Sequence, residues 1–600
     1  MNYYKIVYLC SRMIIYDVFK INKMWNLYKQ LNTRFLLMFF LSMANLLLMH
    51  VFLALTVRFE YPFKIDAIFS NLFSCLIDTT FLFTLSMLLT WGHIKRSLFL
   101  TYVLTALLSF CNIFYSRFFD HYLPNLAFMQ WSNLNDTNVM ESILTGFSWI
   151  DLFFICWAIL FYWLYKHFDS QLLRTRYLST LGWLWGVMLS LVIFFIIILA
   201  FFHDHDINTS IIRFSPIRVQ YTQAPNNMLF RSGFLRRALV CYEDFRQKNI
   251  LLDKYQKDAI WREYTDYSKR ATVAPTIKGE KNLIFIIVES YLAVTSDLVV
   301  DGKEITPFLN RLKRDSSVYY NGHVRPNIEI GESSDGQFIY MTGLLPLRSE
   351  ITVNIAKNKS FYGLPAVLME RGRLKHSHII VPTSPTFWEQ DAMNKKYGIE
   401  TMFSKFDYEQ TLHGNDDLND AQIFEMASHV VSNTGSPFFS LVLTMSMHNP
   451  YNKCVEHGFQ IADKNLPSEY LNYLVDCHYT DYQIEQFINK LKRNGLYDKS
   501  VIVITADHQA HSEHLNMDEN MVSKELPLFI INGEIDKGQV WTGPCNQLDV
   551  YTTLLDMFGV NSPWRGFGQT LLDADYREYS LEQLKTLSDW VIRSDYFRTQ

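Results

Sequence analysis

The distribution of apolar positions divides the chain into two unlike parts. Long apolar stretches all lie before about residue 203, and after that point the apolar runs are short and alternate with polar segments. A helix of roughly 20 apolar residues crosses a bilayer. Five stretches approach that length, at 35–57, 67–91, 98–115, 149–165 and 181–202. The pattern therefore predicts an α-helical transmembrane bundle of five spans over residues 1–202, of which the third and fourth are the shortest.

Basic residues in the short loops predict the orientation of this anchor, because lysine and arginine are retained on the cytoplasmic side. They gather before the first span and after the second and fourth, at Lys20, Lys23, Lys29, Arg34, Lys95, Arg96, Lys166, Arg174 and Arg176. An odd number of spans then places everything after residue 202 outside the cytoplasm. The expected protein is a multi-pass protein of the cell membrane with an extracytoplasmic C-terminal part. No cleavable signal peptide is predicted, because the start lacks a compact apolar core with a small-residue cleavage site.

The C-terminal part contains three short apolar runs that each lead to a polar side chain. Residues 282–288 run into Glu289, residues 438–443 lead to His448, and residues 501–504 lead to Asp507 and His508. Continuous apolar runs of this length are typical of parallel strands that are covered on both faces. Catalytic groups gather at the carboxyl ends of such strands. We therefore expect an α/β domain with a mainly parallel central sheet over residues 279–600, with these side chains at one edge.

Two features of the membrane part leave alternatives open. The stretch 203–278 is polar and aromatic with helical spacing, so it either lies along the membrane surface as a juxtamembrane connector or packs on the catalytic domain. Asp78 falls inside the second predicted span. An intramembrane carboxylate is a functional candidate by default, but a helix-packing residue that is protonated or hydrogen-bonded to a neighbouring span is the interpretation we favour.

The side chains at the strand ends suggest metal chemistry. Glu289, Asp507 and His508 offer carboxylate oxygens and an imidazole nitrogen, which suit zinc or manganese better than calcium. Ser333 precedes a helical pattern and is the preferred nucleophile, since helix N-termini attract anions and a bound cation makes a hydroxyl easier to deprotonate. Taken alone, Ser333 or Ser334 is more simply a helix cap. The neighbouring strand ends favour a metal-activated serine that handles a phosphate or sulfate ester.

Other polar residues near these positions carry weaker signals. His448 stands in a Met-Ser-Met-His-Asn-Pro segment, where it either hydrogen-bonds a substrate phosphate, donates a proton to a leaving group, or belongs to a plain turn. His511, Glu513 and His514 either support the metal ligands or form a solvated polar loop, and we favour the loop. The formal net charge of −4 argues against nucleic acid as a partner.

Six segments, in order, resemble one known family. They are Glu289-Ser290, Ile305-Thr-Pro-Phe-Leu-Asn310, Gly331-Glu-Ser-Ser-Asp335, Thr342-Gly-Leu-Leu-Pro-Leu347, Met445-Ser-Met-His-Asn-Pro450 and Gly495-Leu-Tyr-Asp-Lys-Ser-Val-Ile-Val-Ile-Thr-Ala-Asp-His508. Together they resemble the lipoteichoic acid synthase and phosphoglycerol transferase family of the sulfatase and alkaline phosphatase superfamily. The five-span anchor is also similar to that family's usual architecture.

The resemblance implies one divalent cation, manganese or zinc, held by the residues that match Glu289, Ser333, Asp507 and His508. It also implies a covalent phospho-enzyme intermediate on Ser333, where the synthases usually carry threonine. Trp388 matches a tryptophan that helps to bind glycerol phosphate, but Gln390 stands where the synthases have arginine, and Val381 where they have histidine. Losing a bidentate phosphate donor changes recognition. The donor lipid is therefore left open between phosphatidylglycerol and phosphatidylethanolamine.

The expected function is transfer of a phosphoglycerol-type group from a phospholipid to an extracytoplasmic glycan or glycolipid acceptor. A phosphoethanolamine transferase is one alternative. A hydrolase of the same superfamily is another, although no Cys/Ser-x-Pro-x-Arg element of the sulfatases surrounds Ser333. An inactive scaffold that only binds a ligand is the alternative of a different class.

Overall fold

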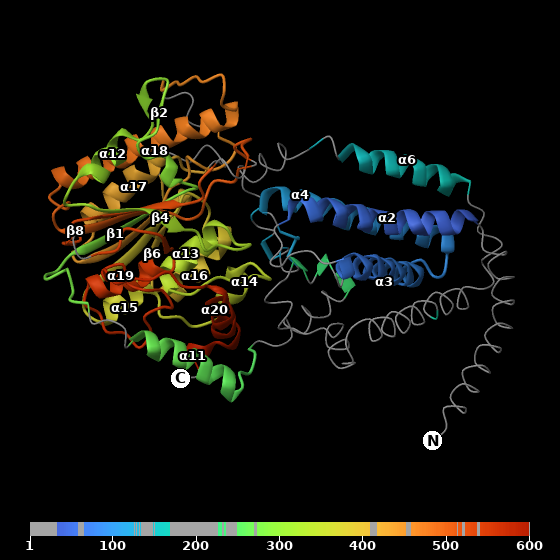
Figure 1. Cartoon of the computed structure of the whole chain (residues 1–600), viewed down its shortest axis with the longest axis horizontal. Helices are drawn as coiled ribbons and strands as arrows, with labels where there is room; N and C mark the ends of the chain where they lie inside the picture. Colours follow the sequence, from blue (N-terminus) through green and yellow to red (C-terminus); the bar gives the residue numbers. More distant parts are fainter. Residues whose placement is uncertain are drawn as a thin grey trace. The chain divides into compact units, whose positions relative to one another are not determined.

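The computed structural model comprises two compact units (Figure 1). One unit is Met1–Leu123 with Phe147–Asp244, and the other is Pro124–Gly146 with Phe245–Gln600. The described residues are 33–57, 65–119, 151–167, 249–268 and 273–598, without 409–416, 452–457, 513, 519–521 and 537–539, together with single residues and short groups between 121 and 235.

Apolar helices form the described part of the first unit. They are α2 (Thr33–Thr56), α3 (Ile65–Leu89), α4 (Ile94–Phe119) and α6 (Leu152–Lys166). Three stretches within them, Phe35–Thr56, Ala67–Leu89 and Ile94–Phe119, are long and apolar enough to cross a membrane. The third span is longer than predicted, whereas α6 has 15 residues, fewer than the roughly 20 that a crossing needs. The predicted fifth span, 181–202, lies outside the described residues except for Gly186, so five spans are not confirmed.

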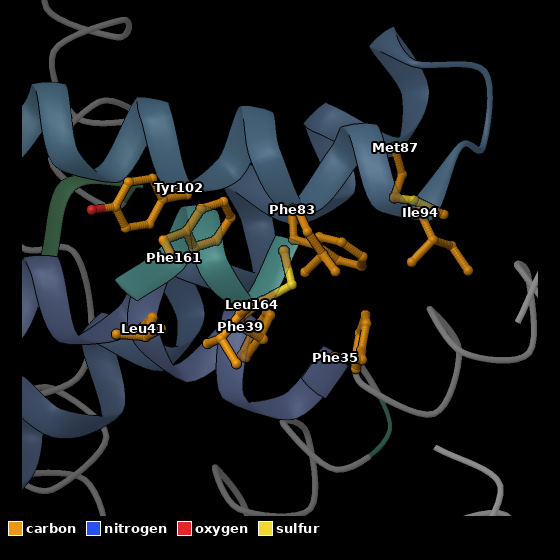
Figure 2. Packing of buried hydrophobic residues seen from close by; sticks show 11 residues of the cluster. Phe35, Phe39, Leu41, Phe83, Met87, Ile94, Tyr102, Phe161 and Leu164 are labelled. Carbon is orange, nitrogen blue, oxygen red and sulfur yellow. The ribbon is translucent and has the colours of Figure 1, made fainter. Parts of the chain in front are cut away.

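The helices of this unit pack through aromatic side chains (Figure 2). Tyr102 of α4 stacks on Phe161 of α6 with ring centroids 3.9 Å apart, and Phe35 of α2 meets Phe83 of α3 edge to face at 5.7 Å. Offset stacking and edge-to-face contact are the arrangements that aromatic quadrupoles favour. Lipid tails are as apolar as these side chains, so the hydrophobic effect does not drive such helices together in a membrane. Close packing of the rings therefore holds α2, α3, α4 and α6 together.

Asp78 is bound by backbone groups of a later segment. Its Oδ2 accepts a hydrogen bond from the Phe234 N–H at 2.6 Å, and its Oδ1 accepts one from the Leu235 N–H at 2.9 Å. Asn71, two turns earlier on α3, donates to the Phe230 carbonyl at 2.7 Å. Asp78 is thus hydrogen-bonded, as the packing interpretation expects, but its partners belong to residues 229–235, within the stretch read as a connector.

The second unit is built on an eight-stranded sheet with the order β10-β4-β9-β8-β1-β7-β5-β6. Its strands are β1 (Asn282–Val288), β4 (Tyr319–Arg325), β5 (His376–Ile380), β6 (Thr401–Phe403), β7 (Phe438–Leu443), β8 (Ser500–Ala506), β9 (Leu526–Ile531) and β10 (Cys545–Asn546). A separate hairpin joins β2 (Val299–Val300) to β3 (Lys303–Glu304). Strand β9 runs antiparallel to both β8 and β4, and the other neighbouring pairs are parallel. The sheet is therefore mixed, with a parallel half that contains all three predicted runs.

Helices cover both faces of this sheet, as the fully buried β1 and β8 require. In Figure 1, α12, α17 and α18 lie on one side, and α13, α15, α16 and α19 lie on the other. The helices of this unit are α11 (Lys254–Ser268), α12 (Pro307–Arg314), α13 (Ser333–Thr342), α14 (Thr352–Ala356), α15 (Leu364–Glu370), α16 (Gln390–Tyr397), α17 (Asp420–Asn433), α18 (Ser468–Arg493), α19 (Asp549–Met557) and α20 (Glu582–Ser594).

Helix α11 belongs to the second unit. Its Ile260 is buried, its Glu263 accepts a hydrogen bond from Gln583 of α20 at 3.1 Å, and the preceding Ile250 N–H donates to the Arg593 carbonyl. Of the two alternatives for the stretch 203–278, packing on the catalytic domain therefore describes α11.

Candidate active site

The carboxyl ends of three adjacent strands bring the predicted side chains together. Strand β1 lies between β8 and β7 and is parallel to both, with Val288 level with Ala506 and Ile287 level with Leu443. The residues that follow, Glu289, Asp507 and Thr444, therefore stand at the same edge of the sheet. This is the edge at which α/β folds place ligands and catalytic groups.

Backbone hydrogen bonds hold the two carboxylate residues in place. The Glu289 N–H donates to Thr444 Oγ1 at 3.0 Å. Asp507 Oδ1 accepts from the N–H groups of Ser290 and His508 at 3.0 and 2.8 Å. Ser290 takes a positive φ of 52°, a strained conformation for a residue with a Cβ, which persists only where its surroundings demand it. These bonds fix the Asp507 carboxylate and the backbone of Glu289 at the strand ends.

Ser333 points its hydroxyl at this cluster. Its Oγ lies 3.1 Å from His508 Nε2 and donates to Glu289 Oε2 at 3.4 Å. The Ser334 hydroxyl instead donates to the Gly331 carbonyl at 2.6 Å, within its own loop. Ser333 is half-buried at the first position of α13, whereas Ser334 is buried. The two adjacent serines are therefore not equivalent, and only Ser333 faces the strand ends.

Close approach between α13 and β8 keeps Ser333 near the strand ends. A Cβ added at Gly336 would collide with the backbone of Asp507, so this position requires a residue without a side chain. Asp335 accepts hydrogen bonds from the Gly331 and Glu329 N–H groups at 2.8 and 3.1 Å and so ties down the loop that precedes Ser333. Burial raises the pKa of Asp335 to about 7, against the opposing effect of these hydrogen bonds.

The electrostatics of the cluster are dominated by burial and by mutual charge. Burial and the neighbouring Glu289 carboxylate raise the pKa of Asp507 to about 7. Burial also opposes ionisation of Glu289, but the hydrogen bond and charge of His508 outweigh it and hold the pKa of Glu289 below its usual range. For His508, burial is outweighed by Asp507, Glu289 and Glu332, which raise its pKa well above the ordinary value. The site therefore concentrates negative charge that a cation would neutralise.

The donor set fits a transition-metal ion. Glu289, Asp507 and His508 each offer one ligand atom, and these atoms lie within 4.8 Å of one another. His508 Nε2 is 3.4 Å from Glu289 Oε1 and 3.6 Å from Asp507 Oδ2. Ligands held about 2.1 Å from a tetrahedral zinc ion stand about 3.4 Å apart, so these separations need little adjustment. Two carboxylates and one imidazole suit zinc or manganese.

A second group of side chains adjoins the first. Glu332, the residue before Ser333, has its Oε2 3.2 Å from His511 Nε2 and 3.9 Å from His508 Nδ1. His511 and His514 are half-buried, so they do not form the solvated loop that we favoured from the sequence, and Glu513 lies outside the described residues. Burial and the charges of His511, His448 and His508 lower the pKa of His514 to about 3. Sequence reasoning missed Glu332, whose only signal was its place beside Ser333.

The two predicted substrate-binding residues occupy different surroundings. His448 is half-buried, with Nδ1 2.6 Å from the Asn449 carbonyl, and its charge contributes to the low pKa of Glu289. Trp388 belongs to the short 3-10 helix η4 (Phe387–Glu389), where both Trp388 and Glu389 take positive φ angles of 49° and 55°. In the described part of the chain, Trp388 makes no hydrogen bond to the four predicted metal ligands.

The segment that carries Trp388 is fastened beside α13. Gln390 and Gln337 exchange amide hydrogen bonds of 2.7 and 3.2 Å, and Gln337 lies one turn beyond Ser333 on the same helix. Lys357 forms an ion pair with Glu389 at 2.6 Å. Gln390 is therefore occupied by a neighbour, and the buried Val381 offers no polar side chain. Neither position supplies a charged phosphate donor.

Comparison with known proteins identifies this arrangement. The sulfatase family model matches residues 281–560, which include all four strand-end and helix-start residues. Lipoteichoic acid synthase 2 of Bacillus subtilis is 31% identical over 321 residues, which are 50% of this chain and 48% of that protein. Over about half of its length the chain is similar to the lipoteichoic acid synthases, and part of the chain matches the sulfatase family. The family predicted from the motifs is thereby confirmed.

Other members of this family match a larger share of the chain. Lipoteichoic acid synthase of Staphylococcus saprophyticus is 24% identical over 510 residues, which are 80% of this chain and 74% of that protein. The crystal structure of lipoteichoic acid synthase LtaP from Listeria monocytogenes covers 54% of this chain and 93% of its own, with a TM-score of 0.45 and 16% identity. The chain spans about half the length of the Bacillus subtilis relative.

Proposed function

We propose that this chain is a membrane-anchored, metal-dependent phosphoglycerol transferase. It moves a phosphoglycerol group from a phospholipid, phosphatidylglycerol in the first instance, to an extracytoplasmic glycan or glycolipid acceptor. The observation that carries the proposal is the position of the Ser333 hydroxyl, 3.1 Å from His508 and 3.4 Å from Glu289, within a cluster of buried carboxylates. The family relatives, which are lipoteichoic acid synthases, support the choice of phosphoglycerol.

Glu289, Asp507 and His508 would hold the cation, with Ser333 Oγ as a further ligand. A bound zinc or manganese ion supplies Lewis-acid chemistry, which makes a hydroxyl easier to deprotonate and stabilises charge on a phosphoryl group. The protein's own contribution is to present these groups in one geometry, since the Ser290 N–H holds the Asp507 carboxylate and Thr444 holds the backbone of Glu289. Preorganised charge of this kind lowers a reaction barrier without reorganisation during the reaction.

The proposed reaction has two displacements at phosphorus. Ser333 Oγ attacks the phosphodiester, the bond from phosphorus to the diacylglycerol oxygen breaks, and phosphoglycerol remains on Ser333. An acceptor hydroxyl then attacks the same phosphorus, and the bond to Ser333 Oγ breaks. His448 is the proposed proton donor to the diacylglycerol oxygen and the proposed proton acceptor from the incoming hydroxyl. Ser333 releases its own proton to solvent as it attacks, and its oxygen takes a proton back from solvent when the product leaves.

The membrane part serves the same chemistry. Three apolar helices long enough to cross a bilayer keep the chain beside its lipid donor. The loop charges favour an extracytoplasmic catalytic domain, and we propose that the acceptor lies on the same side. Trp388 is proposed to contact the glycerol moiety. Because Gln390 is bound to Gln337, the arginine of the synthases has no charged substitute at that position, so headgroup selectivity must be tested directly.

Intact-mass measurement on the full-length chain in detergent tests the proposal. The chain is incubated with manganese and phosphatidylglycerol, beside Ser333→Ala and, as a matched control, Ser334→Ala. We expect a phosphoglycerol-sized adduct in the parent chain and in Ser334→Ala, but none in Ser333→Ala. An adduct that forms with phosphatidylethanolamine but not with phosphatidylglycerol would show that the transferred group is phosphoethanolamine. An adduct that persists in Ser333→Ala would overturn the assignment of the nucleophile, and lipid turnover that ignores a glycan acceptor would establish a hydrolase.

A further inference from the structure

The side chains of Glu332 and His511 form a pair that the proposed reaction does not use. Their ligand atoms, Oε2 and Nε2, are 3.2 Å apart, and both side chains are mostly buried, with 10% and 16% exposed. Together with His508 they make a second group of three ligand atoms within 4.8 Å of one another. We propose that Glu332 and His511 hold a second divalent cation, next to the one at Glu289, Asp507 and His508. This proposal rests on the proposed function for its neighbouring site.

The two groups are distinct because they lie at opposite edges of the His508 ring. Nε2 faces Ser333 and Glu289, at 3.1 and 3.4 Å. Nδ1 lies 2.8 Å from the Gln509 carbonyl and 3.9 Å from Glu332 Oε2. A hydrogen bond from Nδ1 to that carbonyl sets the tautomer that leaves Nε2 available to the first cation. His508 therefore belongs to the first site and separates it from the second.

The chemistry of the second pair suits a borderline cation. One carboxylate oxygen and one imidazole nitrogen are ligands that zinc and manganese both accept. With two protein ligands, the remaining positions are filled by water or by an oxygen of the phosphate substrate. The second cation is consequently held more weakly than the first, and it stands beside the loop that presents the nucleophile.

The backbone at Glu332 supports a directed carboxylate. Its φ and ψ angles are 45° and −121°, a conformation that glycine adopts readily and that a residue with a Cβ adopts only under constraint. Asp335 fixes the preceding Gly331 and Glu329, so the strain cannot relax by movement of that loop. The constrained backbone keeps the Glu332 carboxylate on the side of His511. A plain ion pair between a protonated His511 and Glu332 is the alternative, and it binds no cation.

The number of metal ions bound per chain distinguishes a second cation site from a plain ion pair between Glu332 and His511, and this measurement does not depend on activity. The full-length chain in detergent is dialysed against increasing zinc, and bound zinc per chain is measured by elemental mass spectrometry. The variants are Glu332→Gln and His511→Asn, and the matched control is His429→Asn, because His429 is exposed on α17. Thermal unfolding of each variant verifies that it is folded.

We expect two zinc ions per chain for the parent and for His429→Asn, taken up at two different concentrations. Glu332→Gln and His511→Asn should retain the tight ion and weaken the second by at least about tenfold, the lower range for loss of a metal-site partner. A parent chain that binds one ion would overturn the second site and leave the first intact. A parent chain that binds none would overturn both this inference and the metal dependence of the proposed function. If Glu332→Gln and His511→Asn both took up the second ion as the parent chain does, the proposed second site would also be refuted.

Discussion

Ser333 and His508 are 175 positions apart in the chain, yet Ser333 Oγ lies 3.1 Å from His508 Nε2. The contact exists because α13 begins beside the carboxyl end of β8, where Gly336 allows the helix to approach the backbone of Asp507. A hydroxyl, an imidazole and two carboxylates thus meet at one edge of the sheet.

Replacement of Ser333 should distinguish its hydroxyl from its size. Ser333→Ala removes the nucleophile and should lower the rate of transfer at least about a thousandfold, as loss of a covalent nucleophile does in other enzymes. Ser333→Thr retains the hydroxyl and should keep activity within about tenfold. Single-turnover release of diacylglycerol from labelled phosphatidylglycerol measures both. Equal loss in the two variants would assign Ser333 a structural role.

Cation binding at the first site should depend on pH. Burial disfavours the charged form of His508, but Asp507, Glu289 and Glu332 outweigh it and raise its pKa, so a proton competes with the cation for this imidazole. Binding must displace that proton and, below pH about 7, the proton on Asp507 as well, so affinity should rise by at least about tenfold per pH unit below the His508 pKa and level off above it. Calorimetric titration of manganese in buffers of different ionisation enthalpy counts the released protons. An affinity that is independent of pH between 6 and about 8 would contradict this.

Trp388 should affect substrate binding more than metal binding. Its segment is held beside α13 by the Gln390–Gln337 and Lys357–Glu389 contacts. Trp388→Ala should raise KM by about tenfold, the order expected for one lost aromatic contact, with little change in bound metal. Phe406→Ala is the matched control, because Phe406 is 72% exposed. A fall in kcat at unchanged KM would place Trp388 in the chemical step instead.

The contact of Asp78 with residues 233–235 should stabilise that segment locally. Asp78→Asn leaves one oxygen to accept two backbone N–H groups, so one of the bonds at 2.6 and 2.9 Å is lost. Gly233 has a φ of +74°, and a Cβ there would collide with the Asp78 carboxylate, so Gly233→Ala should disturb the same contact. Each change should speed amide hydrogen exchange in 229–235 about tenfold, equivalent to about 1.4 kcal/mol.

The control for this pair is Gly279→Ala, since nothing lies within 4 Å of a Cβ at Gly279. Exchange in 229–235 should be the same in the control and the parent chain. Unchanged exchange in both Asp78→Asn and Gly233→Ala would show that the carboxylate does not hold this segment.

The amino-acid sequence by itself determined the outline of this protein. Continuous apolar runs are typical of buried parallel strands, so the sequence predicted β1, β7 and β8. It also predicted the polar residues that follow β1 and β8, which are Glu289, Asp507 and His508. The motifs around them also specified the family. The sequence also predicted the apolar stretches 35–57 and 67–91, because a helix that spans a bilayer needs mainly a sufficient length of apolar residues.

Tertiary structure alone decided which polar groups meet. Ser333 differs from Ser334 only through the direction in which each hydroxyl leaves the start of α13, and adjacent helical positions point about 100° apart. The pairing of Glu332 with His511, and of Asp78 with the backbone of Phe234 and Leu235, joins positions far apart in the chain. Such contacts depend on how helices and strands pack against one another. The local pattern of polar and apolar residues does not specify that packing.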